Sequence, residues 1–228
     1  MKVWKLPVAA PQARGKALIN LLPLEPDERI TTIMPLPEDE DTWDELNLIF
    51  ATAKGYVRPI SLSSFTNIYS RGLIAIKLED DDHLISVHTF TEKRDALLAT
   101  RDGQCIRFSL DELRLYGSRN TVGVRGIKLG KGDEVISMAV LRHVAASLEE
   151  RTAYVKQANA IRRALNGAEE DAEESEAEEA NGSGDLSPER YAELGGQEEF
   201  ILTITENGYG KRSSAYEYRT SGRGGNGI

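Results

Sequence analysis

Basic side chains recur beside glycine turns along this chain, and they are the residues whose type and spacing could do chemistry. Three segments share one pattern, in which an apolar run leads to a turn glycine and then to a second short run that carries Arg or Lys. The basic residue follows the glycine by three or four positions, as Arg58, as Arg107, and as Lys211 with Arg212. Cationic groups repeated in this way can hold an extended polyanion through many weak contacts.

A second basic block follows each of these patterns. The run Gly72-Leu73-Ile74-Ala75-Ile76-Lys77-Leu78 is matched by residues 123–129, and related stretches begin at Gly15 and Gly224. Each of Arg14, Arg71 and Arg223 immediately precedes a block glycine, where an exposed turn backbone can also approach an anion. Lys16, Arg119 and Arg125 lie in or next to these blocks.

No set of residues predicts catalysis or metal binding. The three histidines lie far apart in sequence, and no pair of carboxylates at ligand spacing accompanies them. Cys105 is the only cysteine, which excludes both a disulfide within the chain and a cysteine-based metal site. Residues 222–227 fit G-x-G-x-x-G, but their flanks are strand-like, whereas dinucleotide binding needs a helix directly after the motif. We expect no catalytic residue, no metal and no cofactor in this segment.

The formal net charge of −9 hides two regions of opposite sign. Residues 166–199 hold thirteen acidic residues against Arg190 alone, which gives −12. The rest of the chain has 27 basic and 24 acidic residues, so the repeating body carries +3. A basic body that binds a polyanion is therefore compatible with an acidic average.

The elements that position the basic residues are predicted to be short antiparallel strands. Runs of four to seven residues, separated by Gly and Asp turns and by no helix, favour radial blades of four-stranded antiparallel sheet over a parallel sheet. Strands are expected at Leu84-Ile85-Ser86-Val87 and at the matching residues 135–138. We predict an all-β fold in which residues 1–146 form the blades, the first one incomplete, and residues 199–228 begin another blade that is cut short.

An insert interrupts the repeats over residues 147–198. Ser147-Leu148-Glu149-Glu150 has the form of a capping box, and Tyr154, Ala158, Ile161 and Leu165 form one apolar stripe at helical spacing that ends at Asn166-Gly167. Residues 168–185 are rich in Glu, Ala, Gly and Ser, a composition that predicts disorder. Ser187-Pro188 is expected to start a short helix that ends at Gly195-Gly196.

The repeated residues resemble the C-terminal domain of the gyrase A polypeptide, one of the two chains of DNA gyrase, over nearly the whole sequence outside the insert. The resemblance is carried by residues 103–107, 113–115 and 123–133, and by residues 208–227. It implies a six-bladed, propeller-like β-pinwheel around whose basic rim DNA is wrapped. The family's signature box, Gln-Arg-Arg-Gly-Gly-Lys-Gly, has only degenerate equivalents here, and the domain with the catalytic tyrosine is absent, so a fragment is expected.

The resemblance also implies partners and roles for the basic residues. Within a bacterial, ATP-dependent type IIA topoisomerase, this non-catalytic segment would bind double-stranded DNA without sequence specificity and support negative supercoiling. Two gyrase A polypeptides would form a homodimer, gyrase B would be their partner, and other domains would use ATP and Mg²⁺. Wrapping a stiff duplex needs phosphate contacts along an arc. The predicted phosphate contacts are Arg14, Lys16, Arg58, Arg71, Arg107, Arg119, Arg125, Lys211, Arg212 and Arg223.

Two alternatives to a gyrase wrapping domain stay open. The equivalent domain of topoisomerase IV differs mainly in the box upstream, and a propeller scaffold that binds protein would use the same fold with solubilising arginines. With no signal peptide and no apolar run of membrane-spanning length, the sequence favours a cytoplasmic, nucleoid-associated protein with no membrane partner. The acidic insert would either compete with DNA for the rim or only solubilise the chain.

Overall fold

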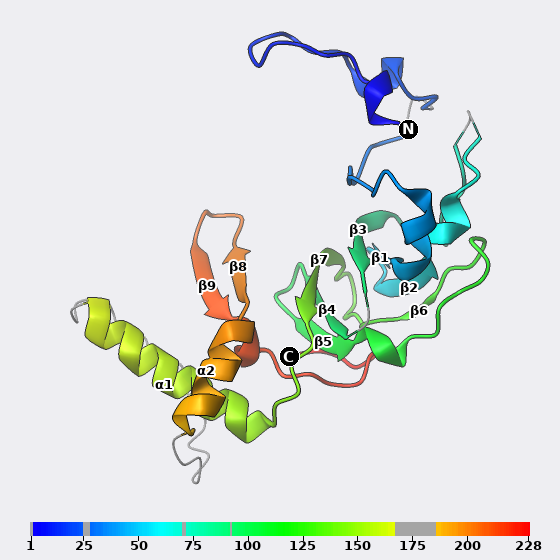
Figure 1. Cartoon of the computed structure of the whole chain (residues 1–228). Coiled ribbons are helices and arrows are strands. Elements are labelled where there is room, and N and C mark those ends of the chain that lie inside the picture. Colours follow the sequence, from blue (N-terminus) through cyan, green and yellow to red (C-terminus); the bar gives the residue numbers. More distant parts are fainter. Residues whose placement is uncertain (1, 25–27, 70–71, 92, 167–185) are drawn as a thin grey trace.

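The computed structural model describes residues 2–24, 28–69, 72–91, 93–166 and 186–228 (Figure 1). Its strands are β1 (Asn47–Thr52), β2 (Tyr56–Ser61), β3 (Leu84–Phe90), β4 (Arg94–Thr100), β5 (Cys105–Ser109), β6 (Val124–Arg125), β7 (Val135–Arg142), β8 (Phe200–Ile204) and β9 (Gly210–Ser214). Two α-helices, α1 (Leu148–Asn166) and α2 (Pro188–Gln197), lie between β7 and β8. Short 3-10 helices are η1 (Val3–Lys5), η2 (Leu18–Asn20), η3 (Glu40–Glu45), η4 (Leu62–Phe65), η5 (Leu110–Glu112) and η6 (Ala215–Glu217).

Three β-hairpins repeat the same local chemistry, which explains the sequence repeat. Each first strand ends at or just before a threonine whose hydroxyl accepts the N–H of the residue after the turn glycine, at 3.3 Å for Thr52, 3.2 Å for Thr100 and 3.2 Å for Thr205. Each second strand ends in a serine whose side chain caps the 3-10 helix that follows: Ser61, Ser109 and Ser214. Side-chain hydrogen bonds of this kind fix where a strand stops and a turn begins.

The hairpins belong to three open antiparallel sheets. The first has the order β3-β1-β2-β6, the second β5-β4-β7, and the third is the pair β8-β9. The predicted strands at 84–87 and 135–138 are confirmed as parts of β3 and β7. Among the described residues, four strands are found only in the first sheet, where β6 comes from the next repeat. An all-β fold of antiparallel sheets is confirmed.

Segments of later repeats cover the outer edges of the first two sheets. Residues 116–126, called the first seam, run along β2, where Tyr116 N donates to Pro59 O at 3.0 Å and Gly126 N donates to Gly55 O at 2.8 Å. Residues 220–228, called the second seam, run along β5 in the same way. Cys105 and Ile228 exchange two backbone hydrogen bonds of 2.9 and 2.8 Å there. The first two hairpins are thus completed by chain that lies far away in sequence.

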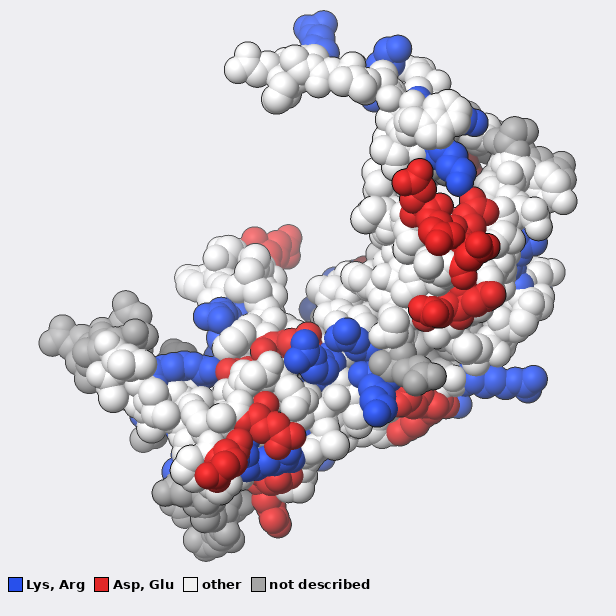
Figure 2. Space-filling model, viewed as in Figure 1, with Lys and Arg blue, Asp and Glu red and all other residues white. Residues whose placement is uncertain are grey.

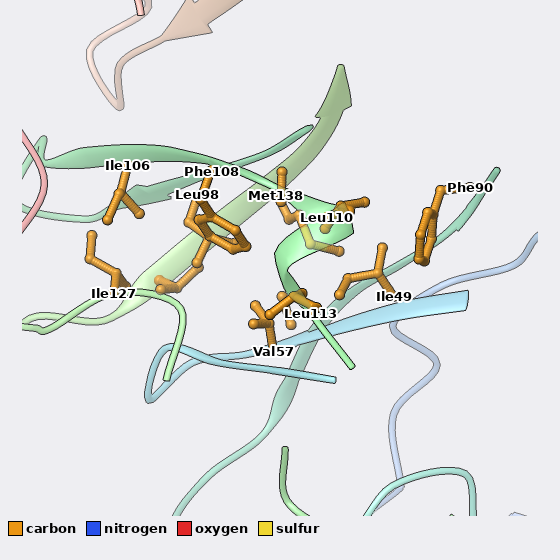
Figure 3. Packing of buried hydrophobic residues seen from close by; sticks show 13 residues of the cluster. Ile49, Val57, Phe90, Leu98, Ile106, Phe108, Leu110, Leu113, Ile127 and Met138 are labelled. Atoms are coloured by element: carbon orange, nitrogen blue, oxygen red, sulfur yellow. The ribbon is translucent and has the colours of Figure 1, made fainter. Parts of the chain in front are cut away.

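The main hydrophobic core lies between the first and second sheets (Figure 3). Ile49 and Val57 of the first hairpin face Leu98, Ile106 and Phe108 of the second, and all five are buried. Ile127, which follows the first seam, closes this cluster at 1% exposure. Burial of this apolar surface stabilises the packing of one sheet on the next.

The insert packs on the third repeat, which begins with β8, β9 and η6, through a small aromatic cluster. Tyr154 and Ala158 of α1, Leu194 of α2 and Tyr216 of η6 are buried together, and the rings of Tyr154 and Tyr216 meet edge to face at 5.2 Å. Both predicted helices are present, and Ser147 and Ser187 cap them as expected.

Two details of the insert differ from the sequence expectation. The far half of the apolar stripe on α1 is not covered, since Ile161 is 48% and Leu165 79% exposed. Helix α2 continues through both glycines to Gln197, because Glu198 N finds Gly195 O at 3.4 Å and closes the last turn. The predicted disorder of residues 168–185 falls outside the described part of the chain.

The second basic block also differs from its expected form. Residues 72–79 form no strand, although residues 123–129 contribute β6. Their contacts with neighbouring segments are single bonds rather than a ladder: Arg58 donates to Ala75 O at 2.6 Å, and Lys77 N donates to Thr121 O at 3.3 Å. Leu73 and Ile76 pack on the second apolar cluster, which contains Trp43 and Phe50.

Candidate nucleic-acid interface

Arg58 is not a surface residue, and its predicted phosphate contact is wrong. Its side chain is fully buried, and its guanidinium donates to Thr121 Oγ1 at 2.9 Å, to Ala75 O at 2.6 Å and to Ser118 O. It also lies over the rings of Phe50 and Tyr116 at 5.9 and 5.7 Å. Burial lowers the pKa of Arg58 from its ordinary value. Its guanidinium thus holds the first seam on the first hairpin.

Arg107 is likewise internal, so its predicted phosphate contact is also wrong. Its residue exposure is 2%, and its Nε donates to Asp95 Oδ2 at 2.8 Å, with Asp95 fully buried. The same guanidinium donates to Ala215 O at 2.6 Å and to Arg142 O at 3.1 Å. His143 Nδ1 lies 2.7 Å from the other oxygen of Asp95. This network joins the second hairpin to the third repeat.

Strand register explains why Arg58 and Arg107 do different work. When the hairpins are aligned on their capping serines, Arg58 pairs with Phe50 and Ile106 pairs with the equivalent Leu98. Arg107 is therefore one residue out of register with Arg58, and a shift of one residue turns a side chain to the opposite face of a sheet. Arg58 accordingly faces the first seam, whereas Arg107 faces the third repeat.

Exposed basic residues lie where the two seams touch. Arg223 Nη1 donates to Arg125 O at 3.4 Å, and both residues are exposed. On the other side of the contact, Lys128 N donates to Gly225 O at 2.8 Å, and Lys128 is also exposed. Gly224 N donates to Gly126 O at 2.6 Å between them. We call Arg125, Lys128 and Arg223 the seam cluster.

Arg119 and Arg223 hold equivalent positions in the two seams. Each lies four residues before a glycine that approaches the preceding hairpin too closely for a side chain: a Cβ on Gly123 would meet Val57 O, and one on Gly227 would lie 2.6 Å from Cys105 O. Both glycines also have positive φ, +107° and +79°. Arg119 is half-buried, with Nη1 3.3 Å from Ser64 O and the guanidinium 6.0 Å from the Phe65 ring, whereas Arg223 is exposed.

The other predicted contacts lie apart from the seam cluster. Lys211 and Arg212 are exposed on β9, where the Arg212 guanidinium lies 3.7 Å from the centroid of the Phe200 ring. Arg14 and Lys16 are exposed in the N-terminal segment, which lies away from the sheets (Figure 1). Arg71 falls outside the described residues. One continuous row of all ten predicted residues is therefore not formed, and two of them, Arg125 and Arg223, come into direct contact.

Lys77 and Lys128 are basic residues that the sequence prediction did not include. The signal was present, since both stand in the Ile-Lys-Leu run that ends each copy of the second block. The prediction was confined to basic residues close to a turn or block glycine. Lys128 lies in the seam cluster, and Lys77 follows Ile76 beside the second apolar cluster.

On the face shown in Figure 2, acidic side chains form a stripe over the part of the body that holds η3. Basic and acidic side chains lie close together over the helical insert. Among the described residues, no group of three or more His, Cys, Asp or Glu could hold a metal ion. In that same part of the chain, every helix is too short or too polar to cross a membrane.

Comparisons with known proteins match this architecture. The family described as DNA gyrase C-terminal domain, beta-propeller, matches residues 1–37, 46–91, 94–142 and 199–228. The gyrase A polypeptide of Granulibacter bethesdensis is 53% identical over 234 residues, which cover 100% of this chain and 25% of that protein. The gyrase A polypeptide of Rickettsia bellii is 48% identical over 229 residues, with 100% and 24% coverage. The chain thus spans about a quarter of the length of these relatives.

Two solved structures share the fold. The C-terminal domain of DNA topoisomerase IV has a TM-score of 0.63 at 20% identity, and the match covers 94% of this chain and 49% of that one. The DNA gyrase A C-terminal domain has a TM-score of 0.59 at 22% identity, with 97% and 54% coverage. The family match leaves out residues 143–198, which contain both α-helices.

Proposed function

Because the chain belongs to the DNA gyrase C-terminal domain family, we propose that it binds and wraps double-stranded DNA without sequence specificity. The observation that carries the proposal is the seam cluster, in which Arg125, Lys128 and Arg223 are all exposed where the two seams are joined by hydrogen bonds. Basic side chains grouped on a rigid backbone suit phosphate contacts, which give affinity but carry no sequence information.

The proposal places the segment in a larger enzyme. As part of gyrase A, it would support ATP-dependent negative supercoiling by a type IIA topoisomerase in which gyrase A forms a homodimer and gyrase B is its partner. The segment itself would be non-catalytic, and ATP and Mg²⁺ would act in other domains. Such an enzyme works in the cytoplasm on the nucleoid. Identities of 53% and 48% to gyrase A polypeptides favour gyrase over topoisomerase IV.

Exposed basic residues elsewhere extend the proposed DNA path. Arg14, Lys16, Lys211 and Arg212 are exposed and are retained as phosphate contacts, as is the half-buried Arg119. The contact proposed for Arg71 rests on its place in the sequence repeat alone. Arg58 and Arg107 are removed from the set because their guanidinium groups are buried.

Salt-dependent DNA binding tests the seam cluster. Duplex affinity of the full chain would be measured by fluorescence anisotropy over a salt series, and Arg125→Gln with Arg223→Gln should lower the slope of log affinity against log salt by about two. The matched control is Arg101→Gln, an exposed arginine paired with Glu134 outside the cluster. An unchanged slope in the double variant would overturn the proposed interface.

Wrapping is tested separately from binding. A nicked circular plasmid would be ligated in the presence of the chain, and the linking number of the product would be compared with that of a protein-free control. A wrapping domain shifts the distribution of topoisomers, whereas a scaffold that binds protein leaves it unchanged. DNA binding without such a shift would reject wrapping and keep the interface.

A further inference from the structure

An internal arginine holds the first seam next to its half-buried arginine. Tyr116 stands three residues before Arg119, and Arg58 lies over its ring at 5.7 Å while donating to Thr121 Oγ1 at 2.9 Å and to Ser118 O. Arg58 thus contacts the chain on both sides of Arg119. A chain segment held at three points has little freedom to move its side chains.

The second sheet lacks this arginine. In the hairpin register, Ile106 takes the place of Arg58, and its side chain is buried in the main core. The apolar side chain of Ile106 cannot donate a hydrogen bond to the second seam. Thr220, which stands three residues before Arg223 as Tyr116 does before Arg119, therefore has no such donor from its own sheet at this register position.

Helix α1 of the insert supplies a substitute. Arg151 lies in its first turn and is 6% exposed. Its Nη1 donates to Thr220 Oγ1 at 3.0 Å, and its Nη2 donates to Val144 O at 3.0 Å. The residue after Thr220 is fixed too, since Ser221 N donates to Arg107 O at 2.8 Å. Tyr154 anchors the same helix to the third repeat.

We propose that Arg151 of the insert positions Arg223 for phosphate binding, by holding Thr220 as Arg58 holds the first seam. The insert lies outside the residues that match the family, so this role belongs to an element added between two repeats. Arg151 is a positioning residue, since it reaches the DNA only through the second seam. The inference rests on the proposed DNA-binding function and names a positioning residue for its seam cluster.

Substitution of the acceptor tests this role without removing a buried charge. Thr220→Val keeps the side-chain shape but removes Oγ1, and it should weaken duplex binding by about threefold, the low end of couplings between contacting residues. Thr220→Ser keeps the hydroxyl and should restore wild-type affinity. Circular dichroism melting of each full-length variant shows whether the fold is kept.

A double-variant cycle separates positioning from general damage. Because Thr220 acts through Arg223, Thr220→Val should add nothing in the Arg223→Gln background. In the Lys211→Gln background, on β9 away from the second seam, its effect should remain about threefold and add to that of Lys211→Gln. Full additivity with Arg223→Gln, or unchanged binding in Thr220→Val, overturns the positioning role. If Arg223→Gln alone changes neither the duplex affinity nor its salt slope, the proposed DNA interface is overturned instead.

Discussion

The first and second seams share one backbone arrangement but are held by arginines of different origin. Arg58, in the first hairpin itself, binds the first seam, whereas Arg151, from a helix outside the repeats, binds the second. The buried arginine of the second hairpin, Arg107, does not bind the second seam with its side chain. It pairs with Asp95 and donates to Ala215 O of the third repeat. Equal folds in consecutive repeats thus do not require equal internal contacts, and the comparison can be tested residue by residue.

The largest expected difference concerns the two buried arginines. Arg107→Met removes the ion-pair partner of the buried Asp95 carboxylate, which keeps His143 beside it, and should cost about 3–5 kcal/mol of unfolding free energy. Arg58→Met removes hydrogen bonds to neutral acceptors only, and should cost about 1–3 kcal/mol. Urea denaturation measures both.

A surface pair provides the control for this comparison. Arg101→Met breaks an ion pair with Glu134 whose side chains are 54% and 39% exposed, and it should change stability by less than about 1 kcal/mol. If Arg58→Met and Arg107→Met cost the same, the distinction between a neutral and a charged joint is wrong.

The second prediction separates the seams through their close-packed glycines. Gly123→Val places a side chain against Val57 O at φ +107°, and should cost about 3 kcal/mol because strain and a backbone clash act together. Gly227→Val meets Cys105 O in the same way, but only at the end of the second seam, and should cost about 1–2 kcal/mol. Equal melting temperatures for the two variants would contradict this order.

The Cys105 thiol serves as a smaller, local reporter of the second seam. Burial raises the pKa of this thiol, so the reactive thiolate is scarcer than in a free cysteine, and alkylation by iodoacetamide should be slow near neutral pH and rise with pH. Gly227→Val should release the backbone of Cys105 from Ile228 and speed alkylation several-fold. Gly123→Val acts on the first seam and should leave the alkylation rate nearly unchanged while the protein stays folded.

The smallest expected effect compares the two equivalent arginines of the seams. Arg223→Gln should lower the salt slope of DNA binding by about one, as for a direct phosphate contact. Arg119→Gln should lower it by less, because Arg119 is half-buried and donates to Ser64 O. A larger slope change for Arg119 than for Arg223 would reverse the assignment of the seam cluster.

Local features of the fold can be predicted from the sequence, whereas the pairing of distant segments cannot. Thr, Gly and Ser at fixed spacing predict the hairpins because their hydrogen bonds are made within a few residues. The seams depend on pairs such as Gly126 with Gly55, which local spacing does not encode. Counting from the turn glycine grouped Arg58 with Arg107, although their distances of three and four residues already placed them on opposite faces.

The same limit applies to the site. The block around Gly123 and Gly224 identified Arg125 and Arg223, which the structure brings into contact. Burial of Arg58 and Arg107 could not be foreseen, since each donates to an acceptor in a later repeat, Thr121 Oγ1 and Ala215 O. The role of Arg151 was hidden for the same reason, because Thr220 lies far along the chain.

The insert leaves and rejoins the repeated body at one spot, where Arg142 N donates to Glu199 Oε2 at 2.7 Å. The chain between Arg142 and Glu199 therefore puts no strain on the sheets, and its length can vary at small entropic cost. A fluorescent domain inserted between α1 and α2 should therefore leave the sheets unchanged. Replacement of the whole insert would also remove Arg151, which holds Thr220. Natural variation in the length of the insert should therefore leave the first turns of α1 in place.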